Sequence, residues 1–185
     1  FNRALTSLDL SNNNIGGVSG YVKKGQLQGT SFKKGDAVQY NGQQCIVFME
    51  EDSGGDLKVQ NISGVVALAE ALKVNRSLIS ANLDYNNIGD EGASAISAAL
   101  ESNTTLEDLS LKPSSGGTKI TAVGAQAIAK MLVVNRALTS VNLLKNDLGD
   151  GAASIVAAAK QNGNIKTLCG IEEGQTEVNL RGDLT

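Results

Sequence analysis

A unit of about 28 residues recurs along this chain of 185 residues, and its clearest copy runs from Asn75 to Asn103. That copy reads as a short strand (LISANL), an asparagine-rich turn (DYNNIGDEG) and a helix (ASAISAALES). The same spacing of leucines, asparagines and glycines returns from Leu106 and from Leu138, and in part near both ends of the sequence. A repeat of this period is typical of a stacked array, in which each unit packs only against its neighbours.

The alternating and helical patterns within the units predict where the elements lie. We expect parallel strands near Ser7 to Leu10, Ser80 to Leu83, Asp108 to Leu111, Ser140 to Leu143 and Lys166 to Leu168. We expect helices over about Val65 to Val74, Gly92 to Ser102, Ala122 to Val134 and Ala152 to Gln161. The asparagine that ends a strand, such as Asn13, is expected to bond the main chain of neighbouring turns.

The repeat pattern stops after Gly16 and resumes at Gly64. The residues between these points carry the short apolar runs and turn signals of β-structure rather than a helical pattern. The chain is therefore predicted to consist of a repeat array (residues 1–16 and 64–185) and a small inserted β subdomain (residues 17–63).

Within the inserted subdomain, the runs AVQY and CIVFM flank Asn41-Gly42, and the run LKVQN follows the turn EEDSGGD. This order predicts three short antiparallel strands joined by hairpin turns, and it leaves room for a fourth strand near Tyr21 to Lys23. If Phe32, Tyr40 and Phe48 pack inside the small sheet, the binding surface of the insertion is polar or main-chain. If instead one edge strand lies exposed, for which Leu57 to Asn61 is the prediction, an extended peptide could join it as a further strand.

A second irregular stretch, KPSSGGTKI, follows Leu111 and contains the only proline of the chain, Pro113. It is longer than the equivalent turn of the other units and rich in glycine and serine. These features predict a loop that protrudes from the array.

The repeated motif L-x-x-L-x-L-x-x-N-x-[IL]-G, followed by G-A-x-A-I-x-x-A-L, resembles the leucine-rich repeats of the ribonuclease-inhibitor type. The resemblance covers about 140 of the 185 residues. The ending from Ile165 to Ile171, which runs into QTEVNLRG, resembles long repeat proteins of algae and other unicellular eukaryotes. The resemblance implies an α/β solenoid with parallel strands on its concave side and helices on its convex side, acting as a protein-binding scaffold without a cofactor.

The insertion, through FKKGDAVQYNGQQCIV and GDLKV, resembles a small SH3-like or tudor-like barrel. The first unit begins with Asn2-Arg3-Ala4-Leu5, which aligns with Asn75-Arg76-Ser77-Leu78. We therefore expect the chain to be a segment of a longer array, or part of a larger complex.

The composition speaks against most catalytic and charged-ligand functions. The chain has no histidine, so the commonest general base and metal ligand is missing. Its net charge of −3 provides no long-range attraction for nucleic acid, and no apolar run reaches the length of a membrane span. Cys45 and Cys169 show no metal-site spacing, and we expect two reduced thiols in a cytoplasmic protein. We predict no enzyme activity, no cofactor and no metal.

Three acidic or glycine-rich stretches have features that favour turns or helix caps over ligand sites. The carboxylates of Asp90-Glu91 are expected to face water or to cap a helix. The stretch SSGGTK lacks the Gly-Lys-Ser/Thr order of a phosphate loop, and EEDSGGD lacks the alternating ligands of a calcium loop.

What remains is a surface for protein binding. Residues that flank the inward leucines should form the concave face, which is small and polar, and four of the six Phe and Tyr residues lie in the insertion. Our candidate binding residues are Asp9, Asn82, Asp84, Tyr85, Asp108, Lys112, Asn142, Leu144, Tyr40 and Phe48.

The most favoured function is a non-enzymatic scaffold that binds a protein partner of unknown identity. Two alternatives stay open at this point: a structural spacer in a large assembly with no binding role, and an insertion that acts as a peptide-binding SH3-like module.

Overall fold

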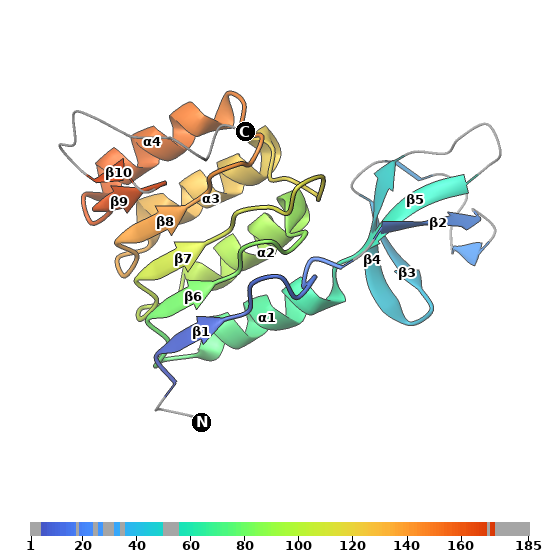
Figure 1. Ribbon diagram of the computed structural model, residues 1–185, viewed down its shortest axis with the longest axis horizontal. Coiled ribbons are helices and arrows are strands. Elements are labelled where there is room, and N and C mark those ends of the chain that lie inside the picture. The colour runs from blue at the N-terminus through green and yellow to red at the C-terminus, as the bar shows by residue number, and fades with distance from the viewer. Residues whose placement is uncertain are drawn as a thin grey trace.

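The computed structural model describes residues 5–17, 19–23, 26–27, 32–33, 36–49, 56–169 and 171–172, and all structural statements concern these residues. The described chain forms two sheets and four helices. One sheet and all four helices belong to the array, and the second sheet belongs to the insertion (Figure 1).

The array is a two-layered solenoid, as the sequence predicted. Its strands are β1 (Ser7–Asp9), β6 (Ser80–Asn82), β7 (Asp108–Ser110), β8 (Ser140–Asn142) and β9 (Thr167–Leu168), which pair in parallel in this order, and β10 (Ile171–Glu172), which pairs antiparallel with β9. Its helices are α1 (Ser63–Val74), α2 (Gly89–Leu100), α3 (Ala122–Val134) and α4 (Gly151–Asn162). Strands and helices form separate layers, and successive units stack from β1 and α1 to β9 and α4 (Figure 1).

The predicted strands are confirmed to within one residue at each end, and the helices to within two residues except at the start of α2. Helix α2 begins at Gly89 and ends at Leu100, whereas the sequence pattern predicted Gly92 to Ser102. Asp90 and Glu91 therefore lie in the first helical turn rather than in the turn before the helix. Gly89-Asp90 is a pair typical of turns, but in the structure it forms the start of the helix.

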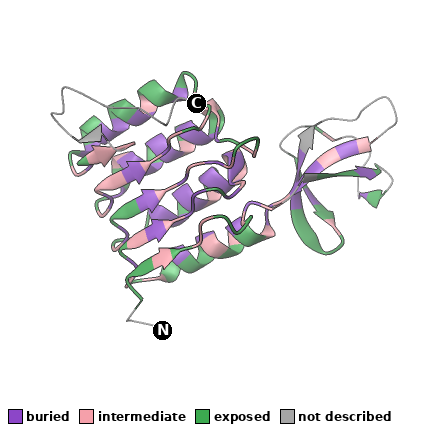
Figure 2. Ribbon diagram, viewed as in Figure 1, coloured by how far each residue is buried: buried purple, intermediate pink, exposed green. Residues whose placement is uncertain are grey.

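The core of the array lies between its two layers. The leucines at the start and at the end of each strand are almost fully buried in the inner units: Leu78, Leu83, Leu106, Leu111, Leu138 and Leu143. Helix residues such as Ile96, Ile128 and Ile155 meet them from the other layer, and the buried residues follow the inner sides of both layers (Figure 2). The described part of this core consists of aliphatic side chains together with Met131.

A ladder of buried asparagines joins the units where each helix ends. Asn103, Asn135 and Asn162 are each under 10% exposed, and each donates its amide to two main-chain carbonyls of the preceding unit. The amide oxygen of Asn103 also accepts from the main-chain N–H groups of Thr105 and Leu106. Asparagine supplies both donors and acceptors, so one side chain satisfies main-chain groups that the helix end leaves unpaired.

A second asparagine ladder runs where the strands end. Asn86 donates to the carbonyl of Leu10 and accepts from the N–H groups of Asn13 and Ile15. Asn146 bonds the carbonyl of Leu111 in the same way. The expected bridging role is thus confirmed for this position in the inner units, whereas the Asn13 side chain is exposed and donates to Ser11 of its own turn.

The inserted sheet has four antiparallel strands: β2 (Ser19–Lys23), β3 (Ala37–Tyr40), β4 (Gln43–Met49) and β5 (Asp56–Asn61). They pair in the order β2-β5-β4-β3, and the sheet lies to one side of the array, beyond the carboxyl ends of the array strands (Figure 1). Its small core consists of Val22, Leu27, Val38, Cys45, Val47, Leu57 and Val59.

The prediction that Leu57 to Asn61 forms an exposed edge is wrong. Strand β5 lies in the interior of the sheet and pairs with both β2 and β4. The fourth strand, β2, which the residues from Tyr21 to Lys23 indicated only weakly, pairs with β5 on that side, so no peptide can add there. The described strands form an open sheet rather than a closed barrel, which gives no support to the SH3-like or tudor-like interpretation.

The loop after Leu111 packs against the preceding unit instead of protruding along its whole length. Pro113 is buried, Ser114 donates its hydroxyl to the Tyr85 carbonyl, and Ile120 is 1% exposed. Only the short stretch at Ser115 and Gly116, together with Lys119, is exposed.

None of the four helices in the described part of the chain combines the length and the apolar character that crossing a lipid bilayer requires.

Candidate functional site

The concave face of the array carries two straight rows of small polar side chains. Strand register aligns Ser7, Ser80, Asp108, Ser140 and Thr167 in one row, and Asp9, Asn82, Ser110 and Asn142 in the other. Four of the candidate binding residues, Asp9, Asn82, Asp108 and Asn142, lie on these rows. Asp9 and Asp108 are exposed, and both asparagines are half-buried.

Asp9 is a fixed negative charge on this face. Hydrogen bonds from the Ser11 hydroxyl and the Ser11 main-chain N–H, at 2.8 Å for the latter, hold the pKa of the Asp9 carboxyl below its ordinary value of 3.8. A smaller contribution in the same direction comes from the Asn82 side chain. Asp9 therefore stays ionised at any pH near neutrality.

Asp84 links two strands rather than facing a ligand. It is 5% exposed, and its carboxylate accepts from the Ser110 hydroxyl at 2.5 Å and from the main-chain N–H of Lys112 at 2.9 Å. The ammonium of Lys112 lies 3.2 Å from the other carboxylate oxygen. All of these partners come from the next unit, so the Asp84 carboxylate ties β6 to β7.

Tyr85 is the large exposed side chain at the end of this face. It is 42% exposed, and the Lys112 ammonium lies 5.7 Å from the centre of its ring. The main-chain N–H of Tyr85 donates to the Lys112 carbonyl at 2.6 Å, and its carbonyl accepts from Ser114 at 2.7 Å. The structure thus brings Asp84, Tyr85 and Lys112 into one cluster.

The backbone at Tyr85 adopts the left-handed conformation, with φ of 59°. The equivalent residues of two other units, Asn12 and Lys145, share it, with φ of 60° and 65°. Asparagine tolerates this conformation well, whereas a bulky aromatic residue is strained there. Tyrosine therefore occupies a position whose backbone geometry favours a smaller side chain.

The remaining candidates lie apart from this cluster or beside it. Leu144 is half-buried and follows Asn142 by two residues, as Lys112 follows Ser110, so the register places it next to Lys112. Tyr40 lies in the inserted sheet, where it packs partly against the small core. Phe48 is part of β4, and its side chain falls outside the described residues.

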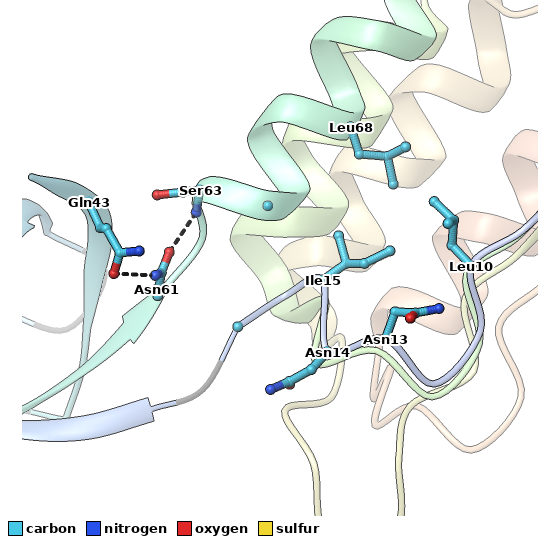
Figure 3. Close-up of a pocket in the computed structure, with 10 residues that line it drawn as sticks. Leu10, Asn13, Asn14, Ile15, Gln43, Asn61, Ser63 and Leu68 are labelled. Atoms are coloured by element: carbon cyan, nitrogen blue, oxygen red, sulfur yellow. Dashed lines mark hydrogen bonds between the residues drawn. The ribbon is translucent and has the colours of Figure 1, made fainter.

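A cleft of about 530 Å³ lies between the first unit and the inserted sheet (Figure 3). Leu10, Ile15 and Leu68 line it on the array side, and Gln43 and Asn61 line it on the side of the insertion. The described residues of its lining include no charged residue and none of the candidate binding residues.

Neither the cysteines nor the acidic residues form a reactive centre in the described part of the chain. Burial raises the pKa of both the Cys45 and the Cys169 thiol, which is the opposite of what an activated nucleophile requires. Among the described residues, no group of three acidic or cysteine side chains is placed to hold a metal ion.

Asp90 has a role that the sequence suggested only in general terms. Its carboxylate accepts from the main-chain N–H of Thr121 at 2.7 Å, from the Thr121 hydroxyl at 2.8 Å and from the N–H of Gly124 at 2.9 Å. Asp90 therefore caps the start of α3, a helix of the next unit, rather than its own helix. Local patterns could not reveal a partner 31 residues away.

Asp90→Ala should lower the free energy of unfolding by about 1–3 kcal/mol, because it removes three bonds at a helix start and leaves part-buried N–H groups unpaired. Asp150 provides the matched control, since it precedes α4 without making a side-chain cap bond. Urea unfolding followed by circular dichroism measures both. Equal losses for Asp90→Ala and Asp150→Ala would contradict the cap across units.

Comparison with known proteins shows similarity to leucine-rich repeat proteins. A family model described as "Leucine Rich repeat" matches residues 1–21 and 74–97. The chain is 31% identical over 104 residues to the ribonuclease inhibitor of Sus scrofa, and 33% identical over 98 residues to NACHT, LRR and PYD domains-containing protein 14 of Mus musculus. These matches cover 55% and 52% of this chain.

The chain spans 21% of the ribonuclease inhibitor and 10% of the mouse protein, so it corresponds to a small part of each. Among solved structures, the tropomodulin C-terminal domain of Caenorhabditis elegans superposes with a TM-score of 0.56 at 13% identity. That match covers 95% of this chain and 78% of the other, and it shows similarity of fold alone.

Proposed function

We propose that this chain, which is built of leucine-rich repeats of the ribonuclease-inhibitor type, is a non-enzymatic scaffold that binds a protein partner at the carboxyl end of its concave face. The binding surface in this proposal consists of Tyr85 as its anchor, Lys112 and Leu144 beside it, and the polar rows of the concave face. We call this set the Tyr85 surface.

One observation carries the proposal: an exposed tyrosine occupies a left-handed position. Folding alone would favour asparagine there, as at Asn12, so the tyrosine needs another reason to be present. A tyrosine offers a large, rigid ring and a hydroxyl, and such residues supply much of the energy of protein interfaces.

The surroundings of Tyr85 suit an anchor of this kind. The Lys112 ammonium lies over the ring and the loop at Ser114 holds its backbone, so little side-chain freedom is lost on binding. The rows of serine and asparagine beyond it leave room for a partner that approaches the concave face. The two exposed acids on this face, Asp9 and Asp108, would favour a partner segment with basic or amide side chains.

The relatives support binding as the class of function. The pig protein is named as an inhibitor of ribonuclease, which is itself a protein, so the name implies protein binding by that relative. The structural spacer remains the competing proposal. The peptide-binding insertion is less favoured, because the strand expected to receive a peptide lies inside the sheet.

Tyr85→Asn tests the proposal. We expect the free energy of unfolding to stay within about 1 kcal/mol of the parent, because relief of backbone strain offsets the lost contact with Lys112. Binding to the partner that the intact chain captures should weaken by at least about 2 kcal/mol, or roughly thirtyfold in dissociation constant. Lys145→Asn, at the equivalent position of another unit, is the control and should retain affinity.

The two measurements separate the alternatives. Unchanged affinity of the Tyr85→Asn variant would rule out Tyr85 as the anchor. An intact chain that retains no partner, under conditions where its fold is verified, would favour the spacer.

A further inference from the structure

The inserted sheet is joined to the array by two chain crossings that touch each other. The chain leaves the array at Gly16 and Gly17 and returns at Ile62 and Ser63, where α1 begins. Both crossings lie close to the first turn of the array, with Asn61 and Ser63 opposite Ile15 (Figure 3).

The main chain is packed tightly at these crossings. A Cβ atom on Gly16 would lie 1.7 Å from the carbonyl oxygen of Asn87, and one on Gly17 would lie 1.9 Å from the carbonyl oxygen of Asn61. A Cβ atom on Gly64 would lie 2.6 Å from the Ile15 carbonyl oxygen. Three glycines therefore allow backbones to meet where any side chain would force them apart, which is unlike a flexible linker.

Gln60 holds this junction together from inside the inserted sheet. It is the penultimate residue of β5 and only 1% exposed. Its side-chain amide donates to the carbonyl of Gly16 at 2.7 Å and to the carbonyl of Asn87 at 2.7 Å. One buried side chain thus binds the outgoing crossing and the turn of the second unit at once.

The bonds continue from this junction towards the Tyr85 surface. The Asn87 side chain donates to Asn14 and Gly17, and it accepts from the main-chain N–H of Thr118. Thr118 belongs to the same loop as Ser114, whose hydroxyl bonds the Tyr85 carbonyl. Hydrogen bonds and short stretches of main chain, including the bond from the Gly117 N–H to the Ser114 carbonyl at 3.0 Å, therefore connect the inserted sheet with the backbone of the proposed anchor.

A second contact supports the same orientation. Ile46 of β4 is 4% exposed and packs in the core of the array rather than in the core of its own sheet. Two residues earlier in β4, the carbonyl of Gln44 accepts from the main-chain N–H of Ile62 at 2.9 Å. The inserted sheet is thus held by apolar packing as well as by hydrogen bonds.

We propose that Gln60 is a positioning residue that fixes the inserted sheet in one orientation on the array, so that the sheet and the Tyr85 surface meet a partner as one rigid surface. The fixed orientation follows from the junction alone. The shared surface rests on the proposed function.

Distance measurement between spin labels tests the fixed orientation without a partner. The labels go on Gln39→Cys in β3 and Val156→Cys in α4, both exposed, in a chain with Cys45→Ala and Cys169→Ala. The parent should give one narrow distance distribution. Gln60→Met keeps the length of the side chain but removes both donors, and its distribution should broaden or split.

Gln126→Met, an exposed glutamine on α3, is the matched control and should leave the distribution narrow. Circular dichroism verifies that each variant is folded. Should Gln60→Met fail to fold, Asn87→Ala loosens the same junction by removing the side-chain bonds of Asn87 to Asn14, Gly17 and Thr118, and it should broaden the distribution instead. A broad distribution in the parent, or a narrow one in a folded Gln60→Met variant, would overturn the proposal.

Hydrogen exchange adds a local readout. The N–H groups of Gly17 and Ile62 are bonded to Asn14 and Gln44 at the junction, and their exchange should accelerate by about tenfold or more in Gln60→Met, with the α3 amides unchanged. Binding then separates the two parts of the account. Loss of partner binding in Tyr85→Asn with a narrow distance distribution supports the proposed function and leaves the junction intact. A broad distribution in Gln60→Met with intact binding supports the role of Gln60 at the junction and shows that binding does not need the fixed orientation.

Discussion

Asn135→Ala is expected to lower the free energy of unfolding by about 3–5 kcal/mol, at the upper end of what single substitutions do. Asn135 is 2% exposed, and its amide donates to the carbonyls of Leu100 at 2.7 Å and Asn103 at 3.1 Å. Its oxygen accepts from the main-chain N–H groups of Ala137 at 2.9 Å and Leu138 at 2.8 Å.

Alanine would leave these four main-chain groups without their partner at a place where two units meet. Each buried group that loses its bond costs about 1–3 kcal/mol, less where water can enter the space. Asn164→Ala is the control, because the Asn164 amide makes one exposed bond at 3.2 Å, and we expect a change within about 0.5 kcal/mol. Urea unfolding of the two variants side by side measures the difference, and similar midpoints would show that the asparagine ladder does not join the units.

Leu83→Asp should have the second large effect, with a loss of about 4 kcal/mol or more. Leu83 is fully buried, at 0% exposure, between β6 and the helices. The substitution removes about 2 kcal/mol or more of apolar burial and places an unpaired carboxylate in the core. Because a domain of this size is stable by only about 5–15 kcal/mol in total, a large fraction of the variant should be unfolded at moderate temperature.

Ile79→Asp is the matched control for this second prediction. Ile79 precedes Leu83 by four residues in the same unit but is 36% exposed, so an aspartate there can reach water. We expect its thermal midpoint to stay near that of the parent. Coincident thermal melts of Leu83→Asp and the parent protein would mean that the strand register assigned to this unit is wrong.

The regular parts of the fold could be predicted because the same spacing of leucines and asparagines recurs in several units. The leucine spacing determined which residues of Ser80–Asn82 and its equivalents face the core, and the structure differs by one residue at the strand ends. The start of α2 was missed because Gly89 and Asp90 are typical of turns, and a glycine with φ of 63° opens the helix here.

The wrong prediction in the insertion, that β5 forms an exposed edge, has a different cause. Strand β2 has one buried apolar side chain among its described ones, Val22, between the exposed Tyr21 and Lys23. So short an alternation carries little signal. The sequence allowed this strand but did not indicate which strand it pairs with, so β5 was predicted as the edge that an added peptide could join.

The sequence predicted on which face of the array the candidate residues lie, but not which of them contact one another. The alternation of strand residues placed Asp84 and Lys112 on the concave side, and Tyr85 was a candidate at the strand end. The contacts that join Asp84 and Tyr85 to Lys112 span 28 and 27 residues and link different units. Their roles differ for that reason: Asp84 is used within the array, whereas Tyr85 stays exposed. Gln60 gave no signal, since a glutamine in a short strand is ordinarily a solvent-facing residue.

Hydrogen exchange of the intact chain, free and bound to the partner it captures, tests the proposed binding surface most directly. The account predicts slower exchange on binding at the amides of Tyr85, Lys112 and Leu144 and along β6 to β8, with the outer faces of α2 and α3 unchanged. Protection confined to those helices, or no protection at the Tyr85 surface, would contradict it.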